Sequence, residues 1–532
     1  MNYSASNFIE PFYSENNGFK TGRDALGVQS ASIALYARLL PGMTNLTLRL
    51  RYYSFYSWLL KEYDKLPIPA HEKTLDHHHK YIRRAELILA FTMVNLHPSV
   101  TGVIGSRYVN EHLIDLEKYG FYNIQKGADK IKKKDRPHED IKDQDLYWDQ
   151  AAGALGQYYS SSMAGMGLSE TLDHFFHILP PGRRLASAFE KNVSKEARDK
   201  FKLIIKNGKL FYEDIHEIQD FSLNQIPVHS EEWTFLVKML KQDDGPDLQT
   251  SDEKVSFKRK ETMFLYLDFL RSGYSSYLRF EQFIFKSLTQ ATKSNGAFFG
   301  WAYYHLSEAS HYALETIFWA ILVNLDGRFL PVNYFIKEIE EIIIQENCRR
   351  LTVTENTKYL DVILASESFS LLEKQTELEY LTRSEENRTE ALSKAVEMLS
   401  LIYLEVEPMM KQVKEFEILN SLQHQQGSVS HIMEMYVTKH FDLTYSNYVS
   451  KIIKFLINNH ISTAYRKMGS NDANLLKFVI EDNIIGHIQT MSPRYTNPRL
   501  KALEHFLNDL NLIDSNNIIT SLGNEVIEQE MN

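Results

Sequence analysis

One segment of the chain gathers most of the polar side chains that could do chemistry together. In WAYYHLSEASHYALETIFWAILVNL, residues 301–325, ionisable and hydroxyl side chains recur every three or four positions. On a helix they fall within an arc of roughly 120°, with apolar residues on the opposite side. We interpret this arc as a hydrogen-bonded face between domains, with a functional polar pocket as the alternative. This polar stripe consists of Tyr304, His305, Glu308, His311 and Glu315.

Two spacings resemble metal-ligand motifs. Glu308 and His311 are separated as in di-iron carboxylate bundles, which need a second such pair and two further glutamates. Glu213 and His216 repeat the spacing, but a chain of this size and composition contains such pairs by chance. In the run HHH at 77–79, neighbouring residues of a helix point in different directions, so they do not converge on one ion. We therefore expect neither a metal nor another cofactor, and we assign no catalytic residue.

A second group of candidates is basic and aromatic. In LRLRYYSFYSWLL, Arg49 and Arg51 lie beside a dense run of aromatic residues. Aromatic rings can stack on unpaired bases while guanidinium groups hold phosphates. However, Tyr52, Phe55 and Tyr56 fall on one face of a helix, which is typical of a buried stripe. We expect these aromatic residues to be buried and keep the two arginines as candidate nucleic-acid contacts.

A third spacing suggests a ribonuclease. Arg107 and His112 have the Arg-x4-His spacing of helical ribonucleases of the HEPN type, in which both residues act at a dimer interface. That family prefers a polar residue after the arginine, and here the residue is Tyr108. A metal-independent ribonuclease that uses these two side chains is therefore an alternative function.

Helices must position all of these side chains. Apolar residues recur at three- and four-residue intervals in long segments, and the alternation typical of strands is nearly absent. Hydrophilic breaks occur at 126–144, 241–260 and 423–430, of which the second has the composition of a linker. The pattern predicts an all-α fold of several domains.

The C-terminus contains a pattern that recurs earlier in the chain. RLKALEHFLNDLNLIDSNNIITSLGNEVIEQE predicts a helix, a polar turn, a short β-prone segment and a last helix with Thr520 as its N-cap. This order resembles the closing half of winged-helix domains. A weaker copy, YSSSMAGMGL followed by HFFHILPPGRRLASAFEKNV, places Gly182 where the C-terminal copy has Gly523. Winged-helix domains bind DNA with a helix in the major groove, and many dock onto proteins instead. The basic candidates near the two copies are Arg183, Arg184, Arg494, Arg499 and Lys501.

Together, the breaks and the two winged-helix-like segments predict a domain order. We expect an N-terminal helical domain ending in a winged-helix-like unit, a connector and linker, a central domain of long helices and a C-terminal winged-helix-like domain. The corresponding segments are 1–190, 191–255, 256–427 and 428–532.

Composition limits the class of protein. The net charge of −10 argues against a nucleic-acid-binding coat over the whole surface, but it leaves room for a local basic patch. Cys348 is the single cysteine, so the chain forms no internal disulfide. The longest apolar run, at 316–325, is half the ~20 residues that a membrane span needs, and the start lacks the pattern of a signal peptide. We expect a cytoplasmic protein with no membrane contact.

Several stretches are also similar to a group of bacterial proteins. DALGVQ, LLPGMTNLTLRLRYYSFYSWLL, YYSSSMAGMGL and WAYYHLSEASHYALE together resemble large helical proteins encoded beside anti-phage defence genes, over roughly residues 20–320. The resemblance implies no established active site. It implies a subunit that works beside an ATPase, a nuclease or another effector.

The sequence thus predicts a non-enzymatic scaffold or sensor of a bacterial anti-phage defence complex. Its expected partners are other subunits of that complex, DNA or RNA. The chain has no GxxxxGK[ST] phosphate loop and no GxSxG nucleophile elbow, which favours binding over catalysis. The alternatives are the HEPN-like ribonuclease and a winged-helix transcriptional regulator.

Overall fold

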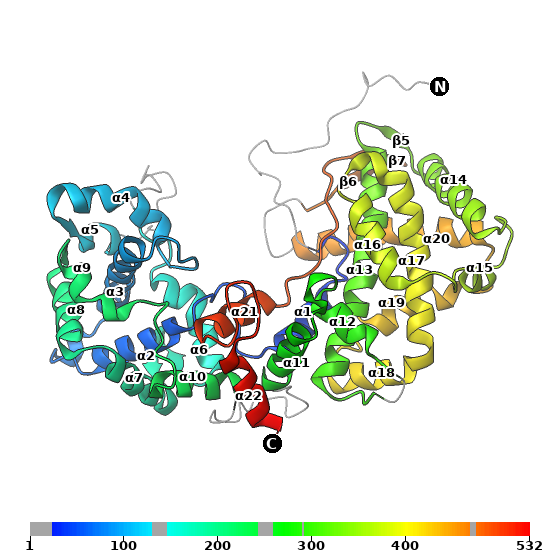
Figure 1. The fold of residues 1–532 in the computed structure, drawn as a ribbon. Coiled ribbons are helices and arrows are strands. Elements are labelled where there is room, and N and C mark those ends of the chain that lie inside the picture. The colour runs from blue at the N-terminus through cyan, green and yellow to red at the C-terminus, as the bar shows by residue number, and fades with distance from the viewer. Residues whose placement is uncertain (1–23, 130–145, 243–258, 290–291, 469–474, 532) are drawn as a thin grey trace. The chain divides into compact units, whose positions relative to one another are not determined.

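Helices dominate the computed structural model, which describes residues 24–129, 146–242, 259–289, 292–468 and 475–531 (Figure 1). The strands within these ranges form small sheets of two or three strands. The prediction of an all-α fold with several domains is confirmed. Most of the charged segment 126–144 and of the linker 241–260 lies outside the described residues.

The chain divides into two compact units, each built from segments far apart in the sequence. Unit 1 comprises Met1–Leu35 and Glu281–Thr496, and unit 2 comprises Tyr36–Phe280 and Asn497–Asn532. This division differs from the four consecutive segments predicted above. Breaks in composition mark where the backbone leaves a helix, but they do not reveal which distant helices pack together.

Unit 1 is built around α13 (Ala297–Leu325), a helix of 29 residues that is buried on nearly all sides. Apart from the polar stripe, small and apolar residues cover its circumference, which is typical of a central core helix. It packs most extensively against α17 (Arg388–Val406), and Figure 1 shows the two side by side within the unit. A three-stranded antiparallel sheet, in the order β5 (Phe329–Pro331), β7 (Ile484–His487) and β6 (Phe478–Glu481), completes the unit.

The other elements of unit 1 are mostly amphipathic helices around this pair. They are β5 (Phe329–Pro331), α14 (Val332–Leu351), α15 (Tyr359–Ala365), α16 (Leu371–Leu381), α18 (Met410–Leu419), α19 (Val429–Tyr436), α20 (Tyr445–Met468), β6 (Phe478–Glu481) and β7 (Ile484–His487). The boundaries between the units fall inside α1 (Ser30–Leu39) and α12 (Phe280–Lys286).

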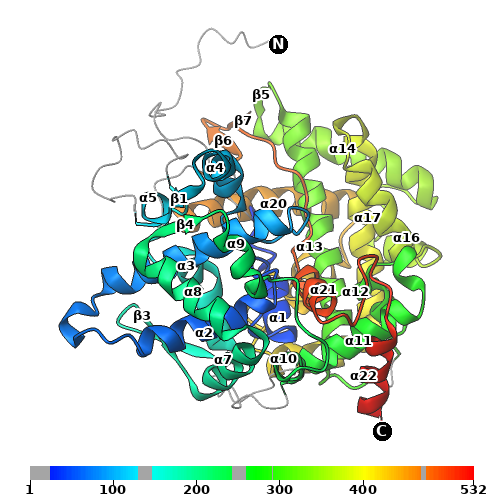
Figure 2. The same cartoon turned by 60° about the vertical axis from the view of Figure 1, so that its left-hand side comes forward.

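Unit 2 is organised around α2 (Arg51–Asp64) and α3 (Leu75–Leu96), both largely buried. The aromatic residues of α2 lie in the core, as the helical spacing predicts: Tyr52, Phe55 and Tyr56 are at most 1% exposed. α2 packs along α7 (Pro180–Asn192), which in turn contacts α10 (Glu231–Lys241), and Figure 2 shows these helices together. A cluster of aromatic rings therefore stabilises this unit.

Short elements connect the helices of unit 2. The remaining elements are α4 (Ser106–Tyr119), β1 (Phe121–Asn123), α5 (Ile124–Ala128), a π-helical turn (Leu155–Tyr159), α6 (Ser160–Gly165), β2 (Ser169–Leu172), β3 (Phe175–Ile178), α8 (Lys195–Asn207), β4 (Lys209–Phe211), α9 (Asp214–Glu217), α11 (Arg259–Arg271), α21 (Leu500–Asp509) and α22 (Ser521–Met531). β1 pairs with β4 and β2 pairs with β3, both antiparallel.

The two segments that the sequence relates to each other share their local architecture. In the first, α6 leads through the β2–β3 hairpin into α7. In the second, α21 leads through an isolated bridge between Ile513 and Ile519 into α22. The hydroxyl of Thr520 accepts a hydrogen bond from the backbone N–H of Gly523 at 3.1 Å, so Thr520 caps the last helix as predicted.

Candidate functional site

The polar stripe of α13 holds a segment of the chain's own backbone. The carboxylate of Glu308 accepts hydrogen bonds from the backbone N–H and the hydroxyl of Thr496, both at 2.8 Å. Glu315 accepts from the N–H of Arg494 at 3.1 Å, and a ring nitrogen of His311 lies 2.9 Å from the carbonyl oxygen of that residue. The hydroxyl of Tyr304 lies 2.9 Å from that of Thr496. The stripe therefore binds the segment 494–496 through hydrogen bonds to its backbone and to the Thr496 side chain.

Burial and neighbouring charges shift the pKa values of side chains in the stripe. Burial disfavours the imidazolium form of His311, but the nearby carboxylates, first those of Glu308 and Glu315, and the carbonyl oxygen of Arg494 together raise its pKa. Burial also raises the pKa of Glu315. His305 packs against the ring of Phe285, 4.7 Å between centroids. The predicted hydrogen-bonded face thus exists, but its partner segment belongs to the same compact unit.

The first two candidate arginines for nucleic acid lie inside unit 2. Arg49 is 8% exposed and pairs with Asp509 at 2.6 Å. Arg51 is 1% exposed, pairs with Glu232 at 3.2 Å and also donates to the carbonyl oxygen of Ser222. Neither guanidinium reaches solvent to contact a phosphate, which corrects the expectation from the sequence. An isolated buried charge is too costly, so each has a carboxylate partner.

The other basic candidates have mixed environments. Arg183 is exposed and pairs with Asp64 at 2.6 Å. Arg499 is partly buried with its guanidinium 5.3 Å from the ring centroid of Tyr36, and burial lowers its pKa. Arg184, Arg494 and Lys501 are exposed as well.

The helix that precedes the C-terminal bridge is enclosed by other helices of unit 2. Phe506 of α21 packs edge-on against Tyr53 of α2, and Glu504 accepts a hydrogen bond from Tyr266 of α11. Trp233 of α10 donates to the carbonyl oxygen of Leu510 at 2.9 Å. A winged-helix regulator needs an exposed recognition helix, so these contacts disfavour α21 in that role.

The ribonuclease candidates each contact another residue of α4. Arg107 is 88% exposed in its side chain and lies 3.5 Å from Glu111 on the next turn of α4. The imidazole of His112 stacks on Tyr108 with 4.1 Å between centroids, and its Nδ1 lies 2.8 Å from the Tyr108 carbonyl oxygen. The two side chains therefore make separate contacts within this chain.

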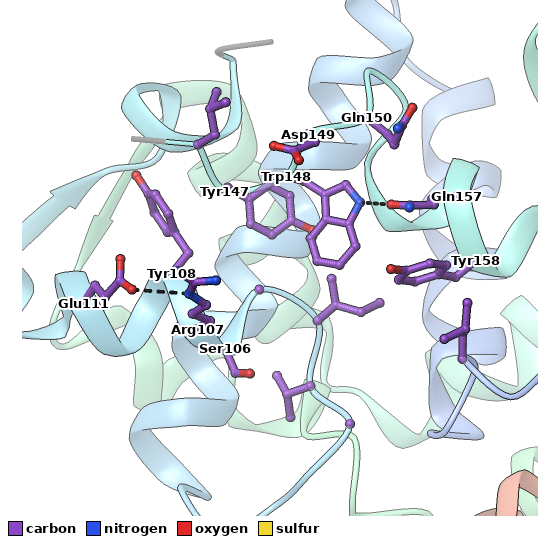
Figure 3. Close-up of a pocket in the computed structure, with 16 residues that line it drawn as sticks. Ser106, Arg107, Tyr108, Glu111, Tyr147, Trp148, Asp149, Gln150, Gln157 and Tyr158 are labelled. Carbon is purple, nitrogen blue, oxygen red and sulfur yellow. Dashed lines mark hydrogen bonds and ion pairs between the residues drawn. The ribbon is translucent and has the colours of Figure 1, made fainter. Parts of the chain in front are cut away.

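A pocket of about 560 Å³ lies in unit 2 where α4 begins (Figure 3). Aromatic, amide and charged side chains share its lining. They come from the start of α4, from the segment 146–150 and from the π-helical turn that precedes α6. The side chains that bear on its chemistry are Arg107, Glu111, Trp148, Asp149, Gln157 and Tyr158.

Two buried charges fix the segment 146–150. Arg83 of α3, which is fully buried, donates to the carbonyl oxygens of Trp148 and Gln150. Glu86, one turn further along α3, accepts from the hydroxyls of Tyr56 and Tyr147 and from two backbone N–H groups. Burial raises the pKa of Glu86. The pocket wall is therefore anchored to the core helix and largely preformed.

A second notable feature is an exposed cluster of rings around the β1–β4 pair. Phe121 and Phe211 face each other across the pair, with ring centroids 6.0 Å apart. Tyr212 donates its N–H to the carbonyl oxygen of Gly120 at 3.0 Å, which brings it next to the end of α4. Figure 2 shows the pair beside α4 and α5. We call this cluster the aromatic surface; it consists of Lys118, Tyr119, Phe121, Lys209, Phe211 and Tyr212.

The side chains of these aromatic residues are substantially exposed. Tyr119 is 59% exposed, and Phe121, Phe211 and Tyr212 are between 39% and 44% exposed. Two lysines lie over the rings: Lys118 is 4.9 Å from the centroid of Tyr119, and Lys209 is 5.6 Å from that of Phe121. Clustered exposed aromatic residues mark interaction sites more often than inert surface.

Sequence reasoning missed both features. The stretches KYGFY and KLFY, at 118–122 and 209–212, carry a lysine close to three and two aromatic residues respectively, which was an available signal. Their meaning depends on the pairing of two strands almost ninety positions apart, which local patterns do not show. The pocket has no sequence motif, because its wall combines Leu46 with three further separate segments.

Comparison with protein-family models, with curated proteins and with solved structures gives no match. Within the described ranges, no three His, Cys, Asp or Glu side chains gather as ligands for a metal ion. Of the helices described, none combines the length and the apolar character that crossing a bilayer requires.

Proposed function

We propose that the protein is a non-enzymatic subunit, a scaffold or a sensor, that binds single-stranded nucleic acid. The observation that carries this proposal is the aromatic surface of unit 2. Four residues on and beside a two-stranded sheet have exposed rings, the rings of Phe121 and Phe211 lie next to each other across the sheet, and a lysine lies over each of two rings. The resemblance of the N-terminal part to defence-associated proteins supplies the setting: a bacterial anti-phage assembly with partner subunits.

The chemistry of this surface suits unpaired bases. Every base has a flat π-face, so exposed aromatic rings bind successive bases with little regard to sequence. Lysines beside the rings supply the charge that a phosphate backbone needs. In a duplex the faces of the bases are already stacked, so a duplex offers this surface only its phosphates. Single strands are therefore favoured over duplexes.

The charge near the surface makes the proposal sharper. Glu213 is exposed and directly follows Tyr212 in the chain. A carboxylate near a phosphate is repulsive, so this residue should limit affinity. Arg184 and Lys501, also exposed in unit 2, stay candidates for further phosphate contacts.

Fluorescence anisotropy with labelled single-stranded DNA and RNA tests the proposal. We expect wild-type protein to bind single strands more tightly than the matching duplex, with affinity falling as salt rises. Phe211→Ala and Tyr212→Ala should each weaken binding by about 1–3 kcal/mol, the usual value of one stacked base. Lys209→Glu should weaken oligonucleotide binding more than either alanine variant does, and Glu213→Gln should strengthen oligonucleotide binding.

Matched controls come from unit 1. Tyr380 is 66% exposed and Lys337 is 75% exposed in its side chain, so Tyr380→Ala and Lys337→Glu change the same chemistry elsewhere. The proposal is wrong if wild type binds no strand at low salt, or if surface and control variants bind alike. Loss of a co-purifying protein partner, with oligonucleotide binding intact, would instead make the surface a protein-docking site.

A further inference from the structure

We infer that the pocket at the start of α4 receives one unpaired nucleobase that carries an exocyclic amine. The inference rests on the proposed function for the source of this base, a single strand held by the same unit. It stands on the pocket's own lining for the chemistry. The aromatic surface and this pocket adjoin opposite ends of α4, which is 14 residues long.

The pocket has the size and construction of a small-ligand site. Its volume of about 560 Å³ lies within the range of 300–1,000 Å³ that is typical of such sites. Arg83 and Glu86 anchor one wall to α3, as described above. A preformed wall lowers the entropic cost of binding a small rigid ligand.

Two rings offer faces to a ligand. The indole N–H of Trp148 donates to the side-chain oxygen of Gln157 at 2.7 Å, which fixes the plane of the ring. Tyr158 stands perpendicular to Trp148, with centroids 5.6 Å apart, and Figure 3 shows the two rings together. A planar ligand can stack on one ring while its edge meets the face of the other.

The positive charge of Arg107 favours a neutral base over a simple organic cation as the ligand of this pocket. Arg107 lines the pocket from α4, and a guanidinium stacks well on a planar ring but repels a cation. Both Arg107 and Trp148 line the pocket, so a flat heterocycle bound there can make a favourable contact with each of them. A quaternary ammonium ion would satisfy Trp148 alone.

The polar edge of the pocket selects hydrogen-bond donors. Asp149 and Glu111 oppose one Arg107 in the lining, which leaves an excess of one negative charge. Carboxylates accept hydrogen bonds from amino groups of bases, as Asp and Glu do from cytosine. Since the side-chain oxygen of Gln157 already accepts from Trp148, its amide nitrogen is left to donate to a ring nitrogen or carbonyl. The same negative charge disfavours a terminal phosphate.

Isothermal titration calorimetry of the full chain with free nucleosides tests the inference. Guanosine and inosine differ by one amine, as do adenosine and purine riboside, whereas uridine has a carbonyl oxygen in place of the amine of cytidine and a proton on N3. We expect at least one amino nucleoside to bind about tenfold more tightly than its partner, the discrimination that one hydrogen-bonded pair supplies. The corresponding monophosphate should bind no more tightly than the nucleoside.

Two exposed positions can be changed without disturbing the core. Asp149→Asn should abolish the preference for nucleosides that carry the amine. Arg107→Ala should weaken the binding of nucleosides with and without the amine about tenfold. Asp173→Asn and Arg271→Ala, at exposed positions outside the pocket lining, are the matched controls and should leave binding unchanged. Circular dichroism and Tm of each variant confirm that the fold is intact.

The outcomes separate this inference from the proposed function. If no nucleoside binds, if choline binds in preference, or if Asp149→Asn leaves the amine preference intact, the inference is overturned, whatever the oligonucleotides do. If oligonucleotides fail to bind but amino nucleosides still bind in the pocket, the proposed function is wrong and the pocket takes a free nucleoside. Phe211→Ala should weaken the binding of oligonucleotides and leave the binding of nucleosides in the pocket unchanged.

Discussion

Gly182 and Gly523 occupy equivalent places in two copies of one small motif. A Cβ atom added to Gly182 would lie 2.2 Å from the carbonyl oxygen of Leu168, and one added to Gly523 would lie 2.2 Å from that of Leu512. In each copy an isoleucine, Ile178 or Ile519, supplies the next contact at 2.9 Å. The helix therefore crosses the preceding turn so closely that only glycine fits.

This close approach makes both glycines intolerant of substitution. Alanine normally stabilises a helix interior by about 1 kcal/mol relative to glycine. Here the backbone must shift, and overpacking of this kind costs about 1–3 kcal/mol, so we expect Gly182→Ala and Gly523→Ala to lower Tm. Gly296→Ala, where a Cβ meets nothing within 4 Å, is the control. Unchanged Tm in both motif variants would refute the packing described here.

The buried pair of Arg51 and Glu232 should be structural. Both side chains are at most 1% exposed, so removing one leaves an unpaired buried charge. We expect Arg51→Met to cost about 3–5 kcal/mol in unfolding free energy, measured by urea denaturation. The double variant with Glu232→Leu should recover part of this loss. Arg184→Ala, at an exposed arginine, should have little effect.

His78 should make unit 2 sensitive to acid. Burial, together with the charges of neighbouring histidines, lowers its pKa to about 3. The unfolded chain binds a proton near pH 6.5 and the folded chain does not, so stability is lost as pH falls from about 6.5 towards 3. At pH 5 the loss is about 2 kcal/mol for this residue.

Thermal denaturation between pH 7 and pH 5 measures this effect. The fall in Tm should be smaller in His78→Phe than in wild type, although the variant starts from a lower Tm because the N–H of Phe176 loses its acceptor. His71, whose side chain is 81% exposed, gives the matched control His71→Phe. An equal acid response in wild type and His78→Phe would contradict the assignment.

The grip of the polar stripe on segment 494–496 is testable by hydrogen exchange. Glu308→Ala removes the acceptor of the Thr496 N–H, a hydrogen bond to a charged group worth about 1.5–3 kcal/mol. We expect exchange at Thr496 to accelerate about tenfold or more, and exchange at Arg494 to respond to Glu315→Ala in the same way. Glu341→Ala, at a side chain 59% exposed, should change neither.

Features that depend on neighbouring residues were predictable. The helical spacing of Tyr52, Phe55 and Tyr56 indicates one buried face, and all three are buried. Thr520 caps its helix because its hydroxyl needs only the N–H of the residue three positions on. The equivalence of Gly182 and Gly523 was predictable for the same reason, since the contacts of each glycine come from a short stretch of neighbouring chain.

Features that depend on distant residues were not predictable. In the sequence, Arg49 and Arg51 resemble phosphate contacts. In the fold, they pair with Asp509 and Glu232, which lie 460 and 181 positions away along the chain. The rings of Phe121 and Phe211 become one surface because two three-residue strands pair. Such short strands leave almost no periodic signal in the sequence.

The sequence by itself therefore determined the helical class, the buried face of α2 and the two related motifs, because periodicity and capping act over one or two turns of backbone. Only the tertiary structure decided which charges are neutralised, what the stripe of α13 holds, and where rings and polar groups meet at the surface. These properties depend on which helices and strands pack together, and that choice is made by the summed burial of segments hundreds of residues apart.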